Sequence, residues 1–374
     1  MAKIEYLQGH MVYDNPMPLL RSRHAYFPGA VQLPSGELLA MIVIGEAFES
    51  VDQCTHITRS TDRGHTWQLQ GPLYDKSVDP FPTSDYFKPV VLADGSMVAL
   101  GYRFHRQDPE SPIGIEATSG ILPGDDVVSF SNDQGRTWTA PRVIECDSPE
   151  VIEVPHSPIQ LHNGDIVASA GLFKSPEGVL PRGQFGVLMR SQDNGKSWDD
   201  NTRWFETPDC SISAYESNVI EMQEGRLVGI CWALDVVGQR ELPNQVTVSH
   251  DNGHHWSEPI DTGHKAQSSS LMYLAGDRLM SIHCHRGDDP GLVVRVIDFT
   301  NDQWTVIAEK NIWGSSIGKQ VEDGQSFYEM MQVIRFGQPS LLKLDNGDIL
   351  ALHWAGVNGQ GMIFSHRLRI GDGG

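Results

Sequence analysis

A serine, an aspartate and a histidine stand close together in the stretch STDRGHTW, at Ser60, Asp62 and His65. These are the side chains of a nucleophile, its base and the acid that orients the base, so the stretch has the residue types of a catalytic triad. The same pattern returns three times, as SNDQGRTW from Ser131, SQDNGKSW from Ser191 and SHDNGHHW from Ser249. Four copies of one catalytic group would serve no purpose, so the repetition predicts a structural role.

The repeated pattern S-x-D-x-G-x-[TSH]-W has the chemistry of a turn. Its aspartate can accept hydrogen bonds from backbone N–H groups of the turn, and its glycine permits a positive φ. Its tryptophan can bury about 200 Å² against neighbouring strands. His65, His254 and His255 are turn residues in this interpretation.

A second repeat is an apolar segment, a tight turn and another apolar segment, as in FPGAVQLPSGELLAM from Phe27. Such a pattern is typical of a β-hairpin. Its six turn residues are Gly36, Gly95, Gly164, Gly225, Asp277 and Gly347. Six units share 374 residues, which leaves about 62 for each, enough for four strands and their loops. We therefore predict an all-β fold, one six-bladed β-propeller of four-stranded antiparallel blades over residues 1–374. The N-terminal KIEYLQGHMVY is expected to pair with the last blade and close the ring.

Composition excludes several classes of partner. The formal net charge is −20 and no basic run occurs, which argues against nucleic acid. No apolar run approaches about 18 residues, so no membrane span is expected. Five scattered cysteines without a C-x-x-C pair fit a reducing compartment. The N-terminal stretch has no apolar secretory segment, and we expect a cytoplasmic protein. The oligomeric state stays open.

The four turns match the repeats known as Asp boxes, and with six blades the chain resembles the sialidase superfamily over nearly its full length. In sialidases the Asp boxes lie on the face away from the substrate. The substrate enters the opposite mouth, where the innermost strands begin. The resemblance therefore implies a carbohydrate substrate and no cofactor, and it directs attention to the residues just before the six hairpin turns.

Glu216 is the clearest candidate at this mouth. It stands nine residues before Gly225 in YESNVIEMQEGRL, which resembles the sialidase segment whose glutamate activates a tyrosine nucleophile. Independently, a charged residue that begins an otherwise buried strand is costly unless it is paired or functional. Catalysis or substrate binding is the sharper hypothesis, and a structural ion pair is the alternative.

Two positions depart from the sialidase pattern. The first-blade arginine of the family is replaced by Tyr26, and the nearest basic residue is Arg23. The tyrosine nucleophile is replaced by Gln338, whose amide cannot act as a phenoxide does. These departures argue against cleavage of sialic acid by the usual mechanism. Arg240 and Arg286 stand where the family places two other arginines, and they could clamp a carboxylate of an acidic sugar.

Glycoside cleavage also needs a general acid. Glu49 is nearest to the position of the family's first-blade aspartate, with Asp85 and Glu153 as rivals on the next two blades. His156 begins an inner strand and could act as acid or base. The candidates for stacking on a sugar are Tyr26, Tyr86, Phe87, Tyr215 and Trp232. His283 and His285 share a strand face, but no third ligand can be placed, so no metal site is predicted.

Three functions follow from these residues. The first is a sialidase-like exo-acting glycoside hydrolase that cleaves a terminal sugar, with an acidic sugar among the candidate substrates. Glu216 would be its nucleophile or base, and another carboxylate its acid. The second is a polysaccharide lyase in which His156 and Tyr215 remove a proton beside a uronate carboxylate. The third is a carbohydrate-binding propeller without catalysis.

Overall fold

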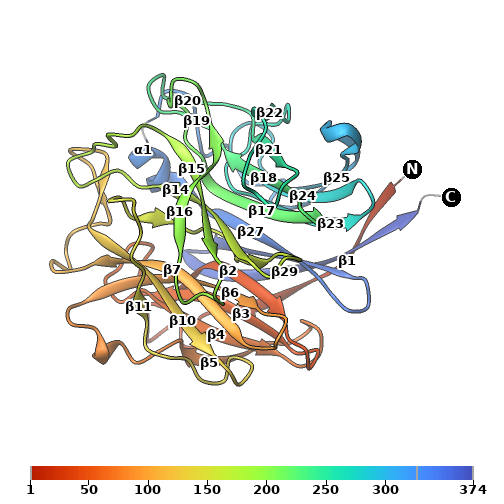
Figure 1. The fold of residues 1–374 in the computed structure, drawn as a ribbon. Helices are drawn as coiled ribbons and strands as arrows, with labels where there is room; N and C mark the ends of the chain where they lie inside the picture. The colour runs from red at the N-terminus through yellow and green to blue at the C-terminus, as the bar shows by residue number, and fades with distance from the viewer. Residues whose placement is uncertain (1, 326, 373–374) are drawn as a thin grey trace.

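The chain folds into six antiparallel sheets, the blades, arranged around one axis (Figure 1). The computed structural model describes residues 2–325 and 327–372. The prediction of an all-β, six-bladed propeller is confirmed. Blade 1 consists of β2 (His24–Gln32), β3 (Leu38–Gly45), β4 (Cys54–Ser60) and β5 (Gln68–Pro72). Blade 2 consists of β6 (Thr83–Val91), β7 (Met97–His105), β10 (Gly124–Ser131) and β11 (Arg142–Val143).

The inner strand of blade 3 is interrupted and forms two short pieces that both pair with β14. The blade consists of β12 (Ile152–Glu153), β13 (Ile159–Gln160), β14 (Ile166–Leu172), β15 (Phe185–Ser191) and β16 (Asp199–Glu206). Blade 4 consists of β17 (Tyr215–Gln223), β18 (Arg226–Trp232), β21 (Gln245–Ser249) and β22 (Ile260–Asp261). Blade 5 consists of β23 (Ser269–Ala275), β24 (Arg278–His285), β25 (Gly291–Asp298) and β26 (Thr305–Trp313).

Blade 6 is built from both ends of the chain. It contains β27 (Phe336–Lys343), β28 (Ile349–Val357) and β29 (Gln360–Asp372), with β1 (Ala2–Tyr13) as its outer strand. Strand β1 pairs with β29 from Ala2 opposite Asp372 to Tyr13 opposite Ile363, so the two ends of the chain lie side by side (Figure 1). This pairing gives hydrogen-bond partners to strand edges that would otherwise be open.

Short elements between the blades complete the mouth. They are the hairpin β8 (Gly114–Ile115) with β9 (Gly120–Ile121), the hairpin β19 (Leu234–Asp235) with β20 (Arg240–Glu241), and the helix α1 (Phe327–Val333). Two 3-10 turns are η1 (Lys76–Val78) and η2 (Thr300–Asp302). No helix among the described residues is long and apolar enough to cross a membrane.

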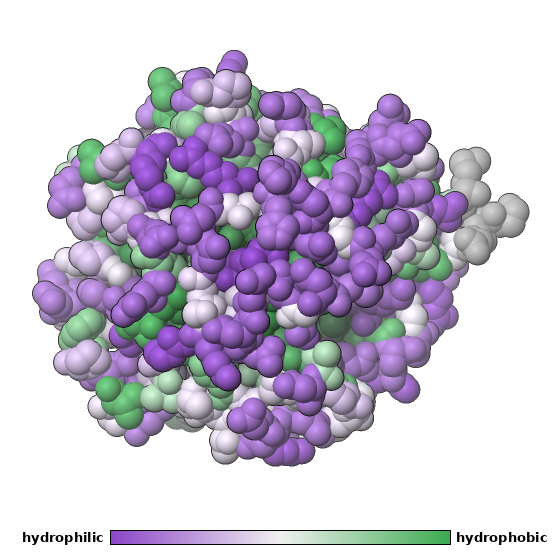
Figure 2. Space-filling model, in the orientation of Figure 1, coloured by the Kyte–Doolittle hydropathy of each residue, from purple (hydrophilic) through white to green (hydrophobic). Residues whose placement is uncertain are grey.

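The core lies between adjacent sheets. One cluster joins blades 1 and 2 through side chains such as Met41 and Phe87, and another joins blades 3 and 4 around the fully buried Trp204. Polar and charged residues cover most of the face in Figure 2, and hydrophobic residues form only small separate patches there. The apolar surface that drives folding is thus largely buried between the blades.

The turns of the repeated S-x-D-x-G-x-[TSH]-W motif are closed by hydrogen bonds within the motif. In the first copy, the Ser60 hydroxyl donates to Asp62 and accepts from the Gly64 N–H, at 2.7 Å in each case. The Thr66 N–H and hydroxyl both donate to the Asp62 carboxylate. Burial alone would raise the pKa of Asp62, but these hydrogen bonds lower it to about 2. Ser60, Asp62 and His65 are therefore residues of a turn and not a catalytic triad, because the Asp62 carboxylate accepts its hydrogen bonds from Ser60 and Thr66 of the same motif.

Arginines from one blade reach the turn of the next and join the blades. Arg190 is buried, its Nη1 lies 2.5 Å from Asp165 of its own blade, and its Nη2 donates to the backbone oxygen of Asn252 in the blade 4 turn. Arg59 does the same toward Gln134, and Arg367 toward Arg63. These bonds fix the angle between blades and, through it, the shape of the mouth.

Replacing Arg190 with methionine is expected to lower the free energy of unfolding by about 3 kcal/mol, because the buried Asp165 would lose its partner. Urea unfolding followed by circular dichroism would measure the loss. The matched control is Arg240→Met, since the Arg240 side chain is 63% exposed and its ion pair with Asp235 should contribute less than about 1 kcal/mol. Equal losses in the two variants would show that the blade-joining bonds do not stabilise the fold.

Candidate active site

Three inner strands carry the same irregularity at the mouth. In β2, β17 and β27, one extra residue interrupts the pairing with the next strand, which defines a β-bulge. The residue in each bulge has a positive φ, of 54° at Phe27, 43° at Glu216 and 40° at Gln338. Such a backbone costs about 1–3 kcal/mol for a residue other than glycine. The three strained residues share one register, each nine positions before its hairpin glycine, which indicates a functional role for the directions of their side chains.

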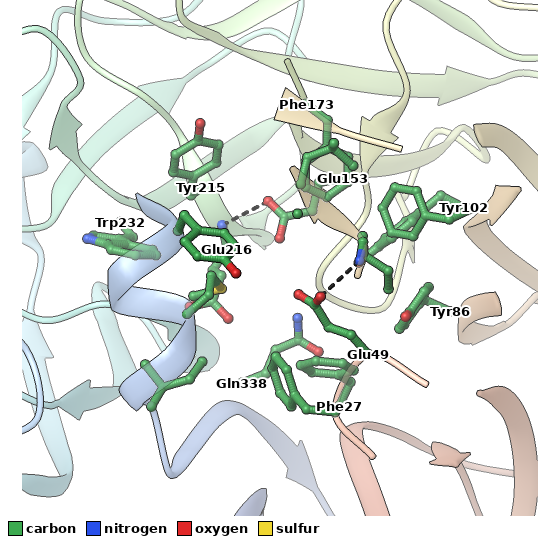
Figure 3. A pocket seen from close by; sticks show the side chains of 18 of the residues that line it. Phe27, Glu49, Tyr86, Tyr102, Glu153, Phe173, Tyr215, Glu216, Trp232 and Gln338 are labelled. Carbon is green, nitrogen blue, oxygen red and sulfur yellow. Dashed lines mark hydrogen bonds between the residues drawn. The ribbon is translucent and has the colours of Figure 1, made fainter. Parts of the chain in front are cut away.

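All three bulge residues line one cavity at the mouth of the propeller. Its empty volume is about 940 Å³, including the part that opens to solvent. The wall of the cavity is largely aromatic. Its aromatic residues are Phe27, Phe48, Tyr86, Tyr102, Phe104, Phe173, Tyr215, Trp232, Tyr328 and Trp354. Three carboxylic side chains point into this aromatic space, from Glu49, Glu153 and Glu216 (Figure 3).

Glu216 lies beside a buried arginine. Its Oε2 is 3.8 Å from Nη1 of Arg286, and neither atom has a hydrogen-bond partner among the described residues. The Arg286 guanidinium is fixed because its Nε donates to the backbone oxygen of Phe336 at 2.9 Å. It also crosses Gly337, where a Cβ atom would lie only 2.1 Å from Nη2. Burial raises the pKa of Glu216, while the charges of Arg286 and Lys88 oppose the rise.

Glu153 is the second carboxyl group of the pair. Pro155 and Pro158 follow it, and because proline has no N–H to donate, the inner strand of blade 3 is interrupted there. Its Oε2 accepts the backbone N–H of Glu216 at 3.3 Å (Figure 3). Burial first, and then the nearby charge of Glu216, raise the pKa of Glu153 to about 8. Glu153 is therefore protonated at neutral pH, and its carboxyl group contacts the backbone of Glu216.

Glu49 faces the same space from the loop after β3. Its Oε2 accepts the backbone N–H of Ile113 at 2.8 Å, which ties this loop to the hairpin region of blade 2 (Figure 3). Burial raises its pKa, and the two backbone hydrogen bonds from Ile113 and Gly114 oppose the rise. One oxygen of Glu49 thus has a structural task, and the side chain still lines the cavity.

The structure brings together seven of the predicted residues along this cavity: Glu49, Tyr86, Glu153, Tyr215, Glu216, Arg286 and Gln338. Tyr86, Tyr215, Glu216 and Gln338 lie near the start of inner strands, at the predicted register, while Glu49 and Arg286 follow the second strands of their blades. The Tyr86 hydroxyl donates to Gln53, so this ring is a fixed part of the wall. Gln338 accepts a hydrogen bond from the buried Lys88 at 2.9 Å.

The structure places five other predicted residues outside the cavity lining. Asp85 is fully buried between blades 1 and 2, where it accepts from the Thr55 N–H and from Lys76 at 2.6 Å. Arg23 pairs with Asp52 of the loop between β3 and β4, and Arg240 pairs with Asp235 of its own hairpin. Tyr26 packs edge-on against Phe48 and Trp354, behind the wall. His156 is buried, and burial and then Lys88 lower its pKa to about 3, so it stays neutral. His156 and Tyr215 do not meet in the cavity as a lyase pair would.

Sequence reasoning overlooked Lys88 and most of the aromatic wall. Lys88 carried a usable signal, because it is a charged residue within the apolar run YFKPVVL, as Glu216 is within its own strand. Tyr102, Phe104 and Phe173 read as ordinary core residues, and nothing in their spacing marks a cavity. Helix α1, which contributes Tyr328 and Met331, lies in a stretch without a repeat to align it.

The part of the chain that the structure describes holds no group of three or more His, Cys, Asp or Glu arranged to bind a metal ion. His283 makes hydrogen bonds to Ser269, Asn244 and Ser281, so both of its ring nitrogens are used. Burial lowers the pKa of His285 to about 4, and its Nε2 lies 3.2 Å from Arg295. These imidazoles pack within and beside blade 5 and do not reach the cavity.

Comparisons with solved structures identify the fold. A protein of unknown function from Dyadobacter fermentans DSM 18053 is similar over 98% of this chain and 99% of its own, with a TM-score of 0.75 and 19% identity. Hadza microbial sialidase Hz136 is similar over 92% of this chain and 65% of its own, with a TM-score of 0.65 and 18% identity. The K499G mutant of NanB sialidase from Streptococcus pneumoniae is similar over 96% of this chain and 70% of its own, with a TM-score of 0.63 and 12% identity. No protein-family model matches the sequence, and no curated protein matches it. The chain thus has the sialidase fold.

Proposed function

We propose that this chain is an exo-acting glycoside hydrolase that removes a terminal sugar from a glycoside or glycan, with Glu153 as general acid and Glu216 as the ionised carboxylate. One observation carries the proposal. Two neighbouring carboxyl groups line one aromatic cavity, and only one of them faces a guanidinium. Hydrolysis of a glycosidic bond needs such a pair, with one group protonated and the other charged.

The surroundings of the two groups support these roles. Glu216 faces Arg286, and the charge of Lys88 also favours its ionised form. Glu153 has a pKa of about 8, and among the causes of the rise is the charge of Glu216 itself. When one group of the pair is charged, the other is held neutral. Glu153 can then protonate the leaving oxygen, while Glu216 attacks the anomeric carbon or activates water.

The cavity suits a neutral sugar better than an acidic one. Arg286 is the one arginine among the described residues that line it, and this guanidinium already faces Glu216. Arg23 and Arg240, which could have completed a carboxylate clamp, pair with Asp52 and Asp235 outside it. A sugar carboxylate would therefore find no unpaired guanidinium in the cavity and would meet the negative charge of Glu216. Aromatic rings stack well on the C–H faces of neutral sugars.

A groove beside the cavity gives the leaving group a place. It shares Phe48, Glu49 and Trp354 with the cavity and continues along helix α1 to Arg335 and Gln360. A single terminal sugar in the cavity would then leave the rest of the glycan in this more open groove. This arrangement favours removal of sugars from a chain end.

A panel of aryl glycosides tests the function. We expect release of the aryl group from at least one neutral sugar among rhamnose, arabinose and fucose, and at least 100-fold lower kcat/KM for sialic acid and glucuronate. The reason is that the one guanidinium among the described residues that line the cavity already faces Glu216. Preferred cleavage of the acidic sugars would overturn the neutral-sugar assignment. Binding of sugars without any turnover would instead support a non-catalytic propeller.

A further inference from the structure

Lys88 lies at the centre of the propeller, beneath the cavity, and is only 2% exposed. Its ammonium donates to the Gln338 side-chain oxygen at 2.9 Å and to the backbone oxygen of Phe27. These acceptors belong to two of the three strained bulges. The lysine stem passes over Gly29, where a Cβ atom would lie 2.9 Å from its Cδ. One side chain from blade 2 thus ties the mouths of blades 1 and 6 together.

The charge of Lys88 has no direct ion-pair partner among the described residues. Both of its hydrogen bonds go to neutral oxygens, and burying an ammonium without a counter-ion costs several kcal/mol. Burial lowers the pKa of Lys88 to about 7, while the charges of Glu216 and Glu153 raise it. A lysine that only filled space would be replaced by an apolar residue at lower cost. The unpaired charge therefore indicates a task toward the carboxyl pair.

We propose that Lys88 is a positioning residue for the hydrolysis, which holds the Gln338 amide and the Phe27 carbonyl in place and stabilises the charge of the Glu216 carboxylate. This inference rests on the proposed function. It adds a second cation, besides Arg286, whose charge favours the ionised form of Glu216. It also gives Gln338 a role as an acceptor that fixes Lys88, at the position where sialidases have their tyrosine.

The other ionisable groups around this centre would not replace Lys88. The groups whose charges couple to Glu216 or Lys88 are Arg286, Glu153, Tyr102, Cys284 and His156. His156 is neutral above a pH of about 3. Burial raises the pKa of Tyr102 and Cys284, which keeps both uncharged. Only Arg286 and Lys88 among these groups are cations, so removal of Lys88 leaves Glu216 with one.

The test is the pH profile of Lys88→Met. Since a neighbouring positive charge lowers the pKa of a carboxyl group, its loss should raise the pKa of Glu216 by about one unit or more. The acidic limb of kcat/KM requires ionised Glu216, so its midpoint should move up by the same amount. At a pH below the midpoint of this limb, kcat/KM of Lys88→Met should be about tenfold or more lower than that of the wild type. Gln338→Glu, which neutralises the charge without removing the lysine, should shift the limb in the same direction and serves if Lys88→Met does not fold.

Titration of Glu216 by carbon NMR, in protein labelled at the glutamate carboxyls, separates this inference from the proposed function. The Glu216 signal is assigned by its absence in Glu216→Gln, and its midpoint needs no turnover. The control is Lys343→Met, because Lys343 joins blades 6 and 5 through the Leu274 oxygen far from the cavity. A midpoint that moves in Lys88→Met and stays in Lys343→Met supports the inference, even if no glycoside is cleaved. An unchanged midpoint overturns it, even if activity is lost.

Discussion

Replacement of Glu216 with glutamine is expected to lower kcat/KM on the order of 10³-fold or more, with the fold intact. Glutamine keeps the size of the side chain but removes the charge that the transition state needs beside the anomeric carbon. The loss corresponds to about 4 kcal/mol of transition-state stabilisation. The side chain is 14% exposed at the cavity, so its replacement should not open the core. Initial rates on the best aryl glycoside, together with thermal unfolding, would measure both effects.

The matched control for Glu216 is Glu224→Gln, on the exposed end of the same hairpin. It changes the net charge by the same amount and should leave kcat/KM within twofold. Added azide would then show how Glu216 acts. If it is the nucleophile, Glu216→Gly should regain activity with azide and yield a glycosyl azide. Full activity of Glu216→Gln would contradict any catalytic role.

Replacement of Glu153 with glutamine should reduce activity in proportion to the need for a proton on the leaving group. With an alkyl or sugar leaving group we expect a loss of about 10²–10⁴-fold, the range of general acid catalysis. With a dinitrophenyl leaving group, which departs without a proton, the loss should be less than tenfold. A series of leaving groups with different pKa values would measure this difference. Equal losses across the series would exclude Glu153 as the acid.

The same carboxyl group is expected to set the alkaline side of the pH profile. In the proposed mechanism Glu153 acts in its protonated form, and because its pKa is about 8, kcat/KM of the wild type should fall as pH rises through about 8. The variant Glu153→Gln should lose this limb, because its amide does not titrate. Glu145→Gln changes an exposed glutamate in the segment that joins blade 2 to blade 3, and it should keep the limb unchanged. An alkaline limb that persists in Glu153→Gln would assign it to another group.

The fold was predictable because its signals repeat. Each S-x-D-x-G-x-[TSH]-W turn and each hairpin glycine marks the same point of a blade, so an error in one copy is corrected by the others. The register also identified Glu216 and Gln338, since a bulge at a fixed distance before the glycine aims both side chains into the cavity. Sequence could not show the bulge itself, because a positive φ at Gln338 leaves no mark on the residue type.

Predictions made for loops were less successful than those made for strands. Arg240 and Arg23 were chosen by their distance from a repeat, but a loop can turn either way. Arg240 pairs with Asp235 of its own hairpin, and Arg23 pairs with Asp52 of a neighbouring loop. Asp85 stands one residue before Tyr86, and alternation along a strand sends its side chain to the opposite face. The aromatic wall depends on contacts between blades, which no local pattern encodes.

Because β1 completes the last blade, the first and last segments of the chain must meet before the ring is whole. Residues about 370 positions apart in sequence then become neighbours, a contact whose formation is slow since the intervening chain must first be ordered. Gln338 and Trp354 belong to this blade. A nascent chain whose β29 has not yet emerged from the ribosome therefore holds its first strand without this partner, and the cavity is complete only after β29 has emerged.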